Sequence, residues 1–247
     1  MGWARAGVLV FMSVVWLHAG WVIDEVTRYA GGEEFRQRLF IQEGRLKSEN
    51  NDETIIIDLV KENVYFIYDR EKRYFGGRLN DVIAELRRSA MTEMNEEENV
   101  LENPTGPLDM AILLEISKTG EKVTLAGFKG EKYQVVVDGE LKEELFISSA
   151  LPIHKEIDPR KLTEVMLRLG GVSAPSSKEF FELQDGYLAL LAKGYPIRAI
   201  EYDPSGEIIL TEVEQIEKRK IAASEFLPPE HYMRIKPDEL YGRDDAF

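Results

Sequence analysis

The 247-residue chain contains no cysteine and only three histidines. The lack of thiols excludes disulfide bonds, thiolate metal sites and a lipid-modified N-terminal cysteine, so packing alone must hold the fold. The two histidines beyond the N-terminal segment, His154 and His231, lie far apart and have no carboxylate at metal-ligand spacing. We therefore expect neither a metal nor any other cofactor.

Motifs that carry catalysis are also missing. The sequence has no G-x-S-x-G, no G-x-x-x-x-G-K-[ST] and no G-x-G-x-x-G pattern. Adjacent carboxylates such as Asp24 and Glu25 point to opposite faces of a strand, so they do not form an acid–base pair. We expect a protein that is not an enzyme. A hydrolase is the remaining alternative, and it would require an acid–base pair that converges only in the fold.

Basic residues are the minority charge. The chain has 31 Lys and Arg against 45 Asp and Glu, for a net charge of −14. This acidity disfavours a nucleic-acid partner, which needs a Lys/Arg face to neutralise phosphates. It also disfavours broad docking on anionic lipid surfaces.

The first twenty residues carry Arg5 as their only charge and are almost wholly apolar from Ala6 to Ala19. A short basic region, an apolar core and a small-residue end predict a secretory signal peptide over residues 1–20. Cleavage is expected after Ala19 or Gly20. An uncleaved membrane anchor is the alternative, because the apolar run continues toward the roughly 20 residues that a membrane span needs. We expect an exported, periplasmic protein that meets the secretion machinery through this segment.

Beyond Gly20 apolar and polar residues mostly alternate, as in half-buried strands. Short strands joined by turns at intervals of roughly 8–12 residues indicate an antiparallel meander that curls on itself. Asp138-Gly139 is a strong hairpin signal. The expected strands, about eleven in all, include Glu34–Glu43, Arg45–Asn50, Thr54–Leu59, Val64–Asp69, Arg73–Phe75, Lys122–Phe128, Lys132–Asp138, Leu141–Ser149, Tyr195–Tyr202 and Glu207–Ile216.

A helical period replaces this alternation in three places. Leu79–Asn95 reads as an amphipathic helix. A second helix begins with Asp158 as N-cap and ends at Gly170, and a third begins with a capping box at Ser176 and either runs to Gly194 or splits at Asp185-Gly186. We expect these helices to form a lid over the sheet, through Leu79, Val82, Ile83, Leu86, Phe180 and Leu188.

Four stretches in consistent order resemble the LolA-like superfamily, the periplasmic lipoprotein-carrier fold, and within it a branch of the domain-of-unknown-function 4412 type. Asn63–Phe75 looks like its strand pair with Asp-x-x-x-Lys-x-Tyr, and Thr124–Asp138 is similar to its x-I-A-G-Y-K hairpin, with Phe128 in place of Tyr. Gly194–Ala199 looks like its Gly-x-Pro-Leu-Arg strand entry, and Phe226–Tyr232 resembles its closing Phe-x-x-Pro-x-Gly-Tyr.

The resemblance implies a mainly antiparallel β fold with α-helices: a strongly curved half-barrel of about eleven strands, closed by lid helices. Residues 21–235 would form this single domain and residues 236–247 a flexible tail. In the best-known members the concave face holds acyl chains of lipids or lipoproteins. A related envelope-stress regulator uses the same scaffold to sense lipid and to bind a protein.

We therefore expect a periplasmic protein that binds an apolar ligand, a lipid or lipoprotein acyl chain, in the concave face without catalysis. The alternative is an envelope-associated protein-interaction or stress-sensing module whose core is filled by its own lid helices. Arg36 and Arg38 fall by alternation on the opposite, solvated face. The candidate ligand-binding residues on the concave face are Phe35, Leu39, Ile41, Ile55, Ile57, Tyr65, Ile67, Val135, Val137 and Phe146.

Overall fold

A computed structural model describes residues 19–51, 53–94, 112–172, 175–203, 206–237 and 239. Most of the predicted signal peptide, most of the predicted tail and Asn95 lie outside the described residues. Within the described ranges, no helix combines the length and the apolar character that crossing a membrane requires.

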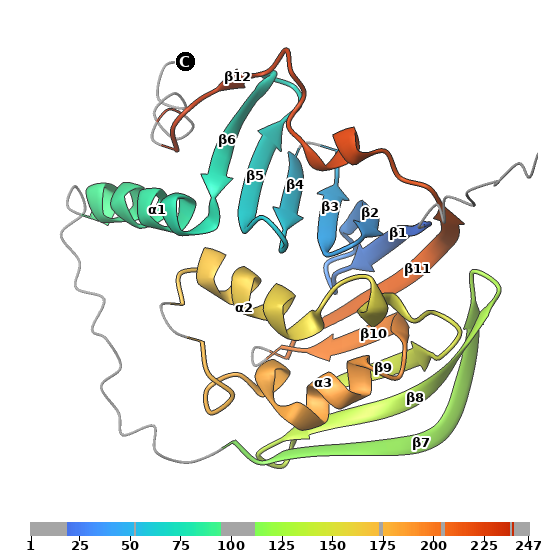
Figure 1. Ribbon diagram of the computed structural model, residues 1–247. Coiled ribbons are helices and arrows are strands. Elements are labelled where there is room, and N and C mark those ends of the chain that lie inside the picture. The colour runs from blue at the N-terminus through green and yellow to red at the C-terminus, as the bar shows by residue number, and fades with distance from the viewer. Residues whose placement is uncertain are drawn as a thin grey trace, which may run out of the picture.

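The described strands form one sheet, open and strongly curved, with few helices (Figure 1). The fold class expected from the sequence is thus confirmed. Eleven of the twelve strands are antiparallel, and the twelfth has only two residues. The strands are β1 (Gly20–Arg28), β2 (Glu34–Gln42), β3 (Arg45–Glu49), β4 (Glu53–Asp58), β5 (Asn63–Tyr68), β6 (Arg73–Arg78), β7 (Leu114–Leu125), β8 (Phe128–Val137), β9 (Glu140–Ser148), β10 (Tyr195–Tyr202), β11 (Ile208–Arg219) and β12 (Met233–Arg234).

Two meanders make up this sheet. β1 to β6 follow one another in one direction, β11 back to β7 follow in the other, and β1 pairs with β11 between them. The first strand of the chain therefore lies in the middle of the sheet. The turns at Glu43-Gly44, Ala126-Gly127 and Asp138-Gly139 have positive φ at both residues, as two-residue type I′ hairpins require.

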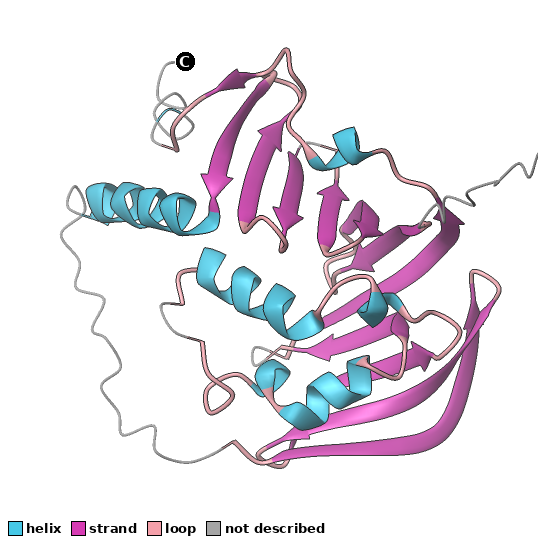
Figure 2. Ribbon diagram, in the orientation of Figure 1, coloured by secondary structure: helices cyan, strands magenta, loops and turns pink. Residues whose placement is uncertain are grey.

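The three α-helices lie within the curve of the sheet (Figure 2). They are α1 (Leu79–Met94), α2 (Pro159–Leu169) and α3 (Asp185–Leu191), and they agree with the expected positions except that α3 begins late. In α2, Asp158 accepts a hydrogen bond from the backbone N–H of Lys161, as an N-cap does. Short 3₁₀ turns form at η1 (Ile153–Lys155), η2 (Phe181–Leu183) and η3 (Ala223–Phe226).

Residues 220–235, which we call the strap, cross the other face of the sheet and end at its β6 edge. Ile221 and Phe226 of the strap are 2% exposed and pack on Val22, Phe40 and Ile56 of the sheet. β12 then pairs in parallel with β6 and covers that edge for two residues. Parts of both faces of β1, β2, β4 and β5 are therefore buried, one beneath the helices and one beneath the strap.

Candidate functional site: the concave face and its helical lid

Helices α1 and α2 cover the concave face over β4, β5 and β6. Their contact is an apolar cluster in which each side chain is at most 8% exposed. Such packing removes apolar surface from water and is the main stabilising contribution of the lid. The members of this cluster are Ile57, Val64 and Phe75 of the sheet, Leu79, Val82 and Ile83 of α1, Val165 of α2 and Ile235.

The segment between β9 and α2 fills the centre of the sheet. Leu151, Ile153 and Ile157 of this segment are nearly inaccessible and pack against the middle strands, with Leu162 of α2 beside them. The sheet side of this cluster consists of Trp21, Ile23, Ile41, Phe146, Ile197 and Val213.

Helix α3 packs against β8 and β9. Tyr187 and Leu190 of α3 contact Val135, Leu145 and Ile147, and Leu190 is 1% exposed. Chain segments that are separate from one another thus cover the apolar side chains at the centre of the sheet, over β4–β6 and over β8 and β9.

A hollow remains between α1 and α2. It has a volume of about 270 Å³ and lies at the start of α1, beside the turn between β4 and β5. Ile57, Leu79 and Val165 form its apolar floor, and these side chains belong to the buried cluster. Its rim is charged and polar, with Asp58, Glu62, Asn63, Asn80, Lys161, Glu164 and Arg168.

One hydrogen bond links the two helices across this rim: Arg168 of α2 donates to the side-chain carbonyl of Asn80 of α1 at 2.6 Å. The side chains that form it are exposed. Such a bond contributes little net stability, since water competes for both groups. The seam between α1 and α2 is therefore held mainly by the apolar floor.

A buried carboxylate lies in the concave face near its centre. Glu25 is 6% exposed and accepts hydrogen bonds from Tyr195 Oη at 2.6 Å and from Gln37 Nε2 at 2.9 Å. Burial raises the pKa of Glu25, although the two hydrogen bonds oppose the shift. The sequence could have indicated this position. Glu25 follows Trp21 and Ile23 at intervals of two residues, so it lies on the same apolar face of the first strand.

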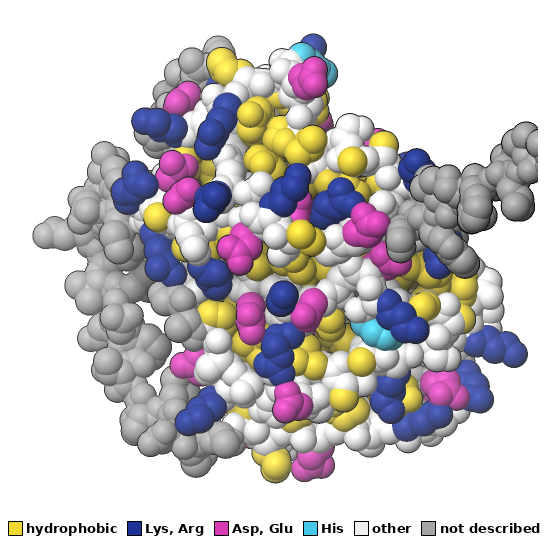
Figure 3. Space-filling model, in the orientation of Figure 1, with side chains coloured by type: hydrophobic (Ala, Val, Ile, Leu, Met, Phe, Trp, Pro, Cys, Tyr) yellow, Lys and Arg dark blue, Asp and Glu magenta, His cyan; other side chains and the backbone are white. Residues whose placement is uncertain are grey.

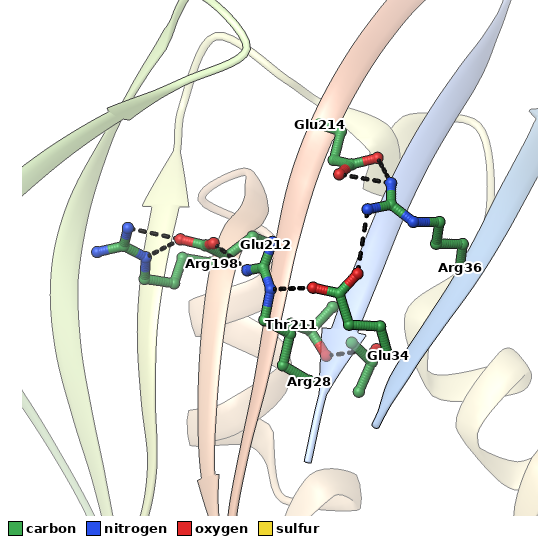
Figure 4. Close-up of polar contacts among 8 residues, drawn as sticks. Arg28, Glu34, Arg36, Arg198, Thr211, Glu212 and Glu214 are labelled. Carbon is green, nitrogen blue, oxygen red and sulfur yellow. Dashed lines mark hydrogen bonds and ion pairs between the residues drawn. The ribbon is translucent and has the colours of Figure 1, made fainter. Parts of the chain in front are cut away.

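Charged side chains form a network on the opposite face of the same strands (Figure 4). Arg28 of β1 donates to Glu34 at 2.9 Å and to Glu212 of β11 at 2.7 Å, and Arg198 of β10 donates to Glu212 at 2.8 Å. Arg36 of β2 bonds Glu214. The pairs Arg28–Glu212 and Arg36–Glu214 cross the junction between the two meanders, and the network shows that Arg36 points away from the concave face.

The space-filling view shows that the helix-covered side of the molecule mixes basic, acidic and apolar side chains (Figure 3). The surface around the lid is therefore a mosaic of both charge signs, although the chain has a net charge of −14.

Seven of the ten candidate residues lie in the clusters beneath the lid. Leu39, Ile41 and Phe146 belong to the central cluster, Ile55 and Ile57 lie beneath α1 and α2, and Val135 and Val137 lie beneath α3. Whether any of them contacts a ligand stays a prediction.

The assignment of Tyr65 and Ile67 to the concave face is wrong. Both pack in the cluster beneath the strap, because the register of β4 and β5 pairs Ile57 with Val64 and so turns Val64 toward the helices. Side chains alternate along a strand, so Tyr65 and Ile67 face the other way. Every residue from Val64 to Tyr68 is apolar or aromatic, and periodicity alone could not choose between the faces.

Phe35, expected to line the concave face, is 38% exposed near the start of β2. Of the expected lid residues, Leu79, Val82, Ile83 and Leu86 pack as anticipated. Leu188 is half-buried and lies outside the cluster through which Tyr187 and Leu190 attach α3. Phe180, also half-buried, precedes η2 and is not part of that cluster either.

The two histidines do not approach each other in the fold. His154 lies in η1 with its Nδ1 shielded from solvent and without a hydrogen bond, and His231 stacks edge-on against Tyr232 at 4.8 Å between ring centroids. Over the ranges that the structure describes, no three His, Asp or Glu side chains are grouped so that they could hold a metal ion.

No family model matches this sequence, and comparison with curated proteins finds no match. A search of solved structures finds matches at low identity, three of which follow. A structure of PNGF-II is 10% identical, with 89% of this chain and 31% of that chain covered and a TM-score of 0.38. The MucA/MucB complex of Pseudomonas aeruginosa is 6% identical, with 89% and 59% covered and a TM-score of 0.39.

The third is the LolA superfamily protein NE2245 of Nitrosomonas europaea, which is 8% identical, with 85% and 90% covered and a TM-score of 0.30. The chain spans less than two thirds of the length of the first two structures. With every TM-score below 0.5, these similarities assign neither a family nor an activity. The membership in the domain-of-unknown-function 4412 branch stays a prediction.

Proposed function

We propose that this protein is exported and binds an apolar chain, such as the acyl chain of a lipid or lipoprotein, between the concave face and its helical lid. The protein acts by binding and not by catalysis. The observation that supports this proposal is the hollow between α1 and α2, whose floor of Ile57, Leu79 and Val165 is continuous with the apolar cluster beneath the lid.

The volume of the hollow determines how far the lid must open to bind a ligand. Its volume of about 270 Å³ lies just below the range of about 300–1,000 Å³ that is common for small-molecule sites. The closed form can therefore hold only part of a long chain. A full acyl chain requires α1 and α2 to separate, which breaks the bond between Arg168 and Asn80 and exposes the floor to the ligand instead of to the other helix.

The second candidate function is a protein-interaction module with a permanently filled core. The nearly complete burial of Val82, Ile83 and Leu190 favours it, because separating a lid from its sheet exposes apolar surface that must be covered again. In that case the lid would stay closed, and the partner would bind elsewhere on the surface.

The test is binding of dansyl-labelled undecanoic acid, a fluorescent acyl probe, to the protein purified without detergent. Val165→Trp fills the hollow from its floor and should weaken probe binding at least tenfold. Met166→Trp is the matched control, because Met166 is the next residue of α2 and is 48% exposed, and it should bind like the wild type. Near-ultraviolet circular dichroism confirms that both variants are folded.

Equal binding by Val165→Trp and the wild type would place the probe elsewhere and refute the proposed site. If the wild type binds no probe at all, the filled-core module becomes the better account. Mass analysis of the protein recovered from a periplasmic fraction tests export separately, since removal of residues 1–19 or 1–20 gives a defined mature mass.

A further inference from the structure

Three glutamates from three different elements meet where η2 and α3 dock on the sheet. Glu143 of β9 and Glu201 of β10 are directly opposite each other in the antiparallel pair, and Glu182 comes from η2. Opposite residues in such a pair have Cβ atoms roughly 5 Å apart. All three line one pocket of about 310 Å³.

The hydrogen bonding of this cluster depends on a single donor from the lid. Tyr187 of α3 donates its hydroxyl to Glu143 at 2.8 Å. Glu182 Oε2 is shielded from solvent and has no hydrogen-bond partner. The hydroxyl of Tyr187 is thus the lid's hydrogen-bond donor to this cluster of three acidic groups, and the like charges face one another across the docking surface.

The other groups around Glu143 give little compensation. Val135 of β8 lies opposite it, and the pocket also contains Ile209, Phe181, Tyr202 and Asp203. The cation that lines the pocket, Lys142, pairs with Glu140 at 2.7 Å. Lys193 lies over the ring of Tyr133, and Arg160 of α2 pairs with Asp185 at the start of α3.

Burial and charge together shift the titration of this cluster. Burial, and then the charges of Glu201 and Glu182, raise the pKa of Glu143 to about 7, although the bond from Tyr187 opposes the shift. Burial and Glu182 also raise the pKa of Glu201. A carboxyl group whose pKa is raised in the docked form stabilises docking at low pH and loses that effect as the pH rises toward 7.

We propose that these glutamates form a pH-sensitive latch that holds the η2–α3 segment on β9 and β10 when Glu143 is protonated and loosens it when all three carboxylates are ionised. The latch regulates the part of the lid over β8 and β9. The latch is a property of the ligand-free protein, so its test does not depend on whether the protein binds an acyl chain.

Hydrogen exchange of the amides of α3 tests the latch on the whole chain without ligand. If Glu143 has its ordinary pKa of 4.5 when undocked and about 7 when docked, the opening equilibrium rises about 30-fold between about pH 5.5 and about pH 8.5. After correction for intrinsic exchange, protection of residues 185–191 should fall by that factor. Protection of β4, far from the cluster, should stay constant relative to it.

Three variants separate the latch from a general effect of pH. Glu143→Gln keeps an acceptor for Tyr187 but cannot ionise, so it should remove the pH dependence and keep α3 protected at high pH. Glu201→Gln removes one facing charge and should move the transition to lower pH, which also covers a failure of Glu143→Gln to fold. Glu115→Gln, an exposed acid of β7 that does not line the pocket, should leave the wild-type profile unchanged. A pH-independent wild type, or a Glu143→Gln variant that keeps the dependence, overturns the proposal.

Discussion

The attachment of α3 to the sheet can be tested with two leucines that lie two positions apart on the same short helix. Leu190 is 1% exposed and packs on β8 and β9, whereas Leu188 is half-buried and lies outside that cluster. Leu190→Ala removes three buried carbon groups, a loss of about 2.4 kcal/mol by transfer alone. With the cavity that remains, the expected loss is about 3 kcal/mol, within the range of about 2–5 kcal/mol for such changes.

Leu188→Ala removes the same atoms from a site outside the cluster and should cost less than about 1 kcal/mol. Urea denaturation followed by circular dichroism measures both. With a slope of about 2 kcal/mol per molar urea, the midpoint of Leu190→Ala should fall by about 1.5 M. An equal or larger shift for Leu188→Ala would mean that α3 presents a different face to the sheet, and the assignment of the lid contact would be wrong.

Two further predictions concern the face opposite the lid. Ile67→Asp places a charge beneath the strap, where Ile67 is 2% exposed, and should release the strap; limited proteolysis should then cleave residues 220–235 faster than in the wild type, and an unchanged rate would contradict the packing of Ile67 there. Arg28→Ala removes the centre of the charged network, but because the Arg28 side chain is 37% exposed we expect only a small loss of stability, which shrinks further in 1 M salt. A salt-independent fall in the thermal unfolding midpoint as large as that of Leu190→Ala would show that the network is more than a surface feature.

Much of the sheet could be predicted because the turn residues and the alternation of apolar and polar residues indicate the same strand bounds along most of the chain. The strand Tyr195–Tyr202 has the predicted bounds, and the Asp138-Gly139 turn adopts the backbone that its residues favour. The strand that begins at Leu114 was expected only from Lys122, since its register shift between Lys118 and Lys122 interrupts the alternation with Gly120.

The helix expected from Ser176 illustrates where local signals fail. The side chains of Ser176 and Glu179 do interact, at 3.3 Å, yet the chain makes only a turn there before η2. Leu183 is buried in the fold, at 2% exposed, and tertiary packing of this kind overrides a capping signal that is worth about 1 kcal/mol.

The acidic cluster could not be predicted for a related reason. Glu143 and Glu201 are far apart in the sequence and each lies in an ordinary alternating strand. Only the pairing of β9 with β10 places them opposite each other, and only the docking of η2 adds Glu182. The spacing of residues predicts neither the β9–β10 pairing nor the docking of η2, because both depend on which distant segments become neighbours in the fold.

The pairing of the first strand with the eleventh also constrains how the chain can fold. Arg28 and Glu212 bond across this junction although they are 184 positions apart. Closing so long a loop is slow, so β1 must keep one edge unpaired until β11 has been synthesised. A chain that stops before residue 208 would leave two separate half-sheets with open edges at β1 and β10, where strands from other molecules can add. Translation arrest or C-terminal truncation should therefore produce aggregates and not a smaller folded protein.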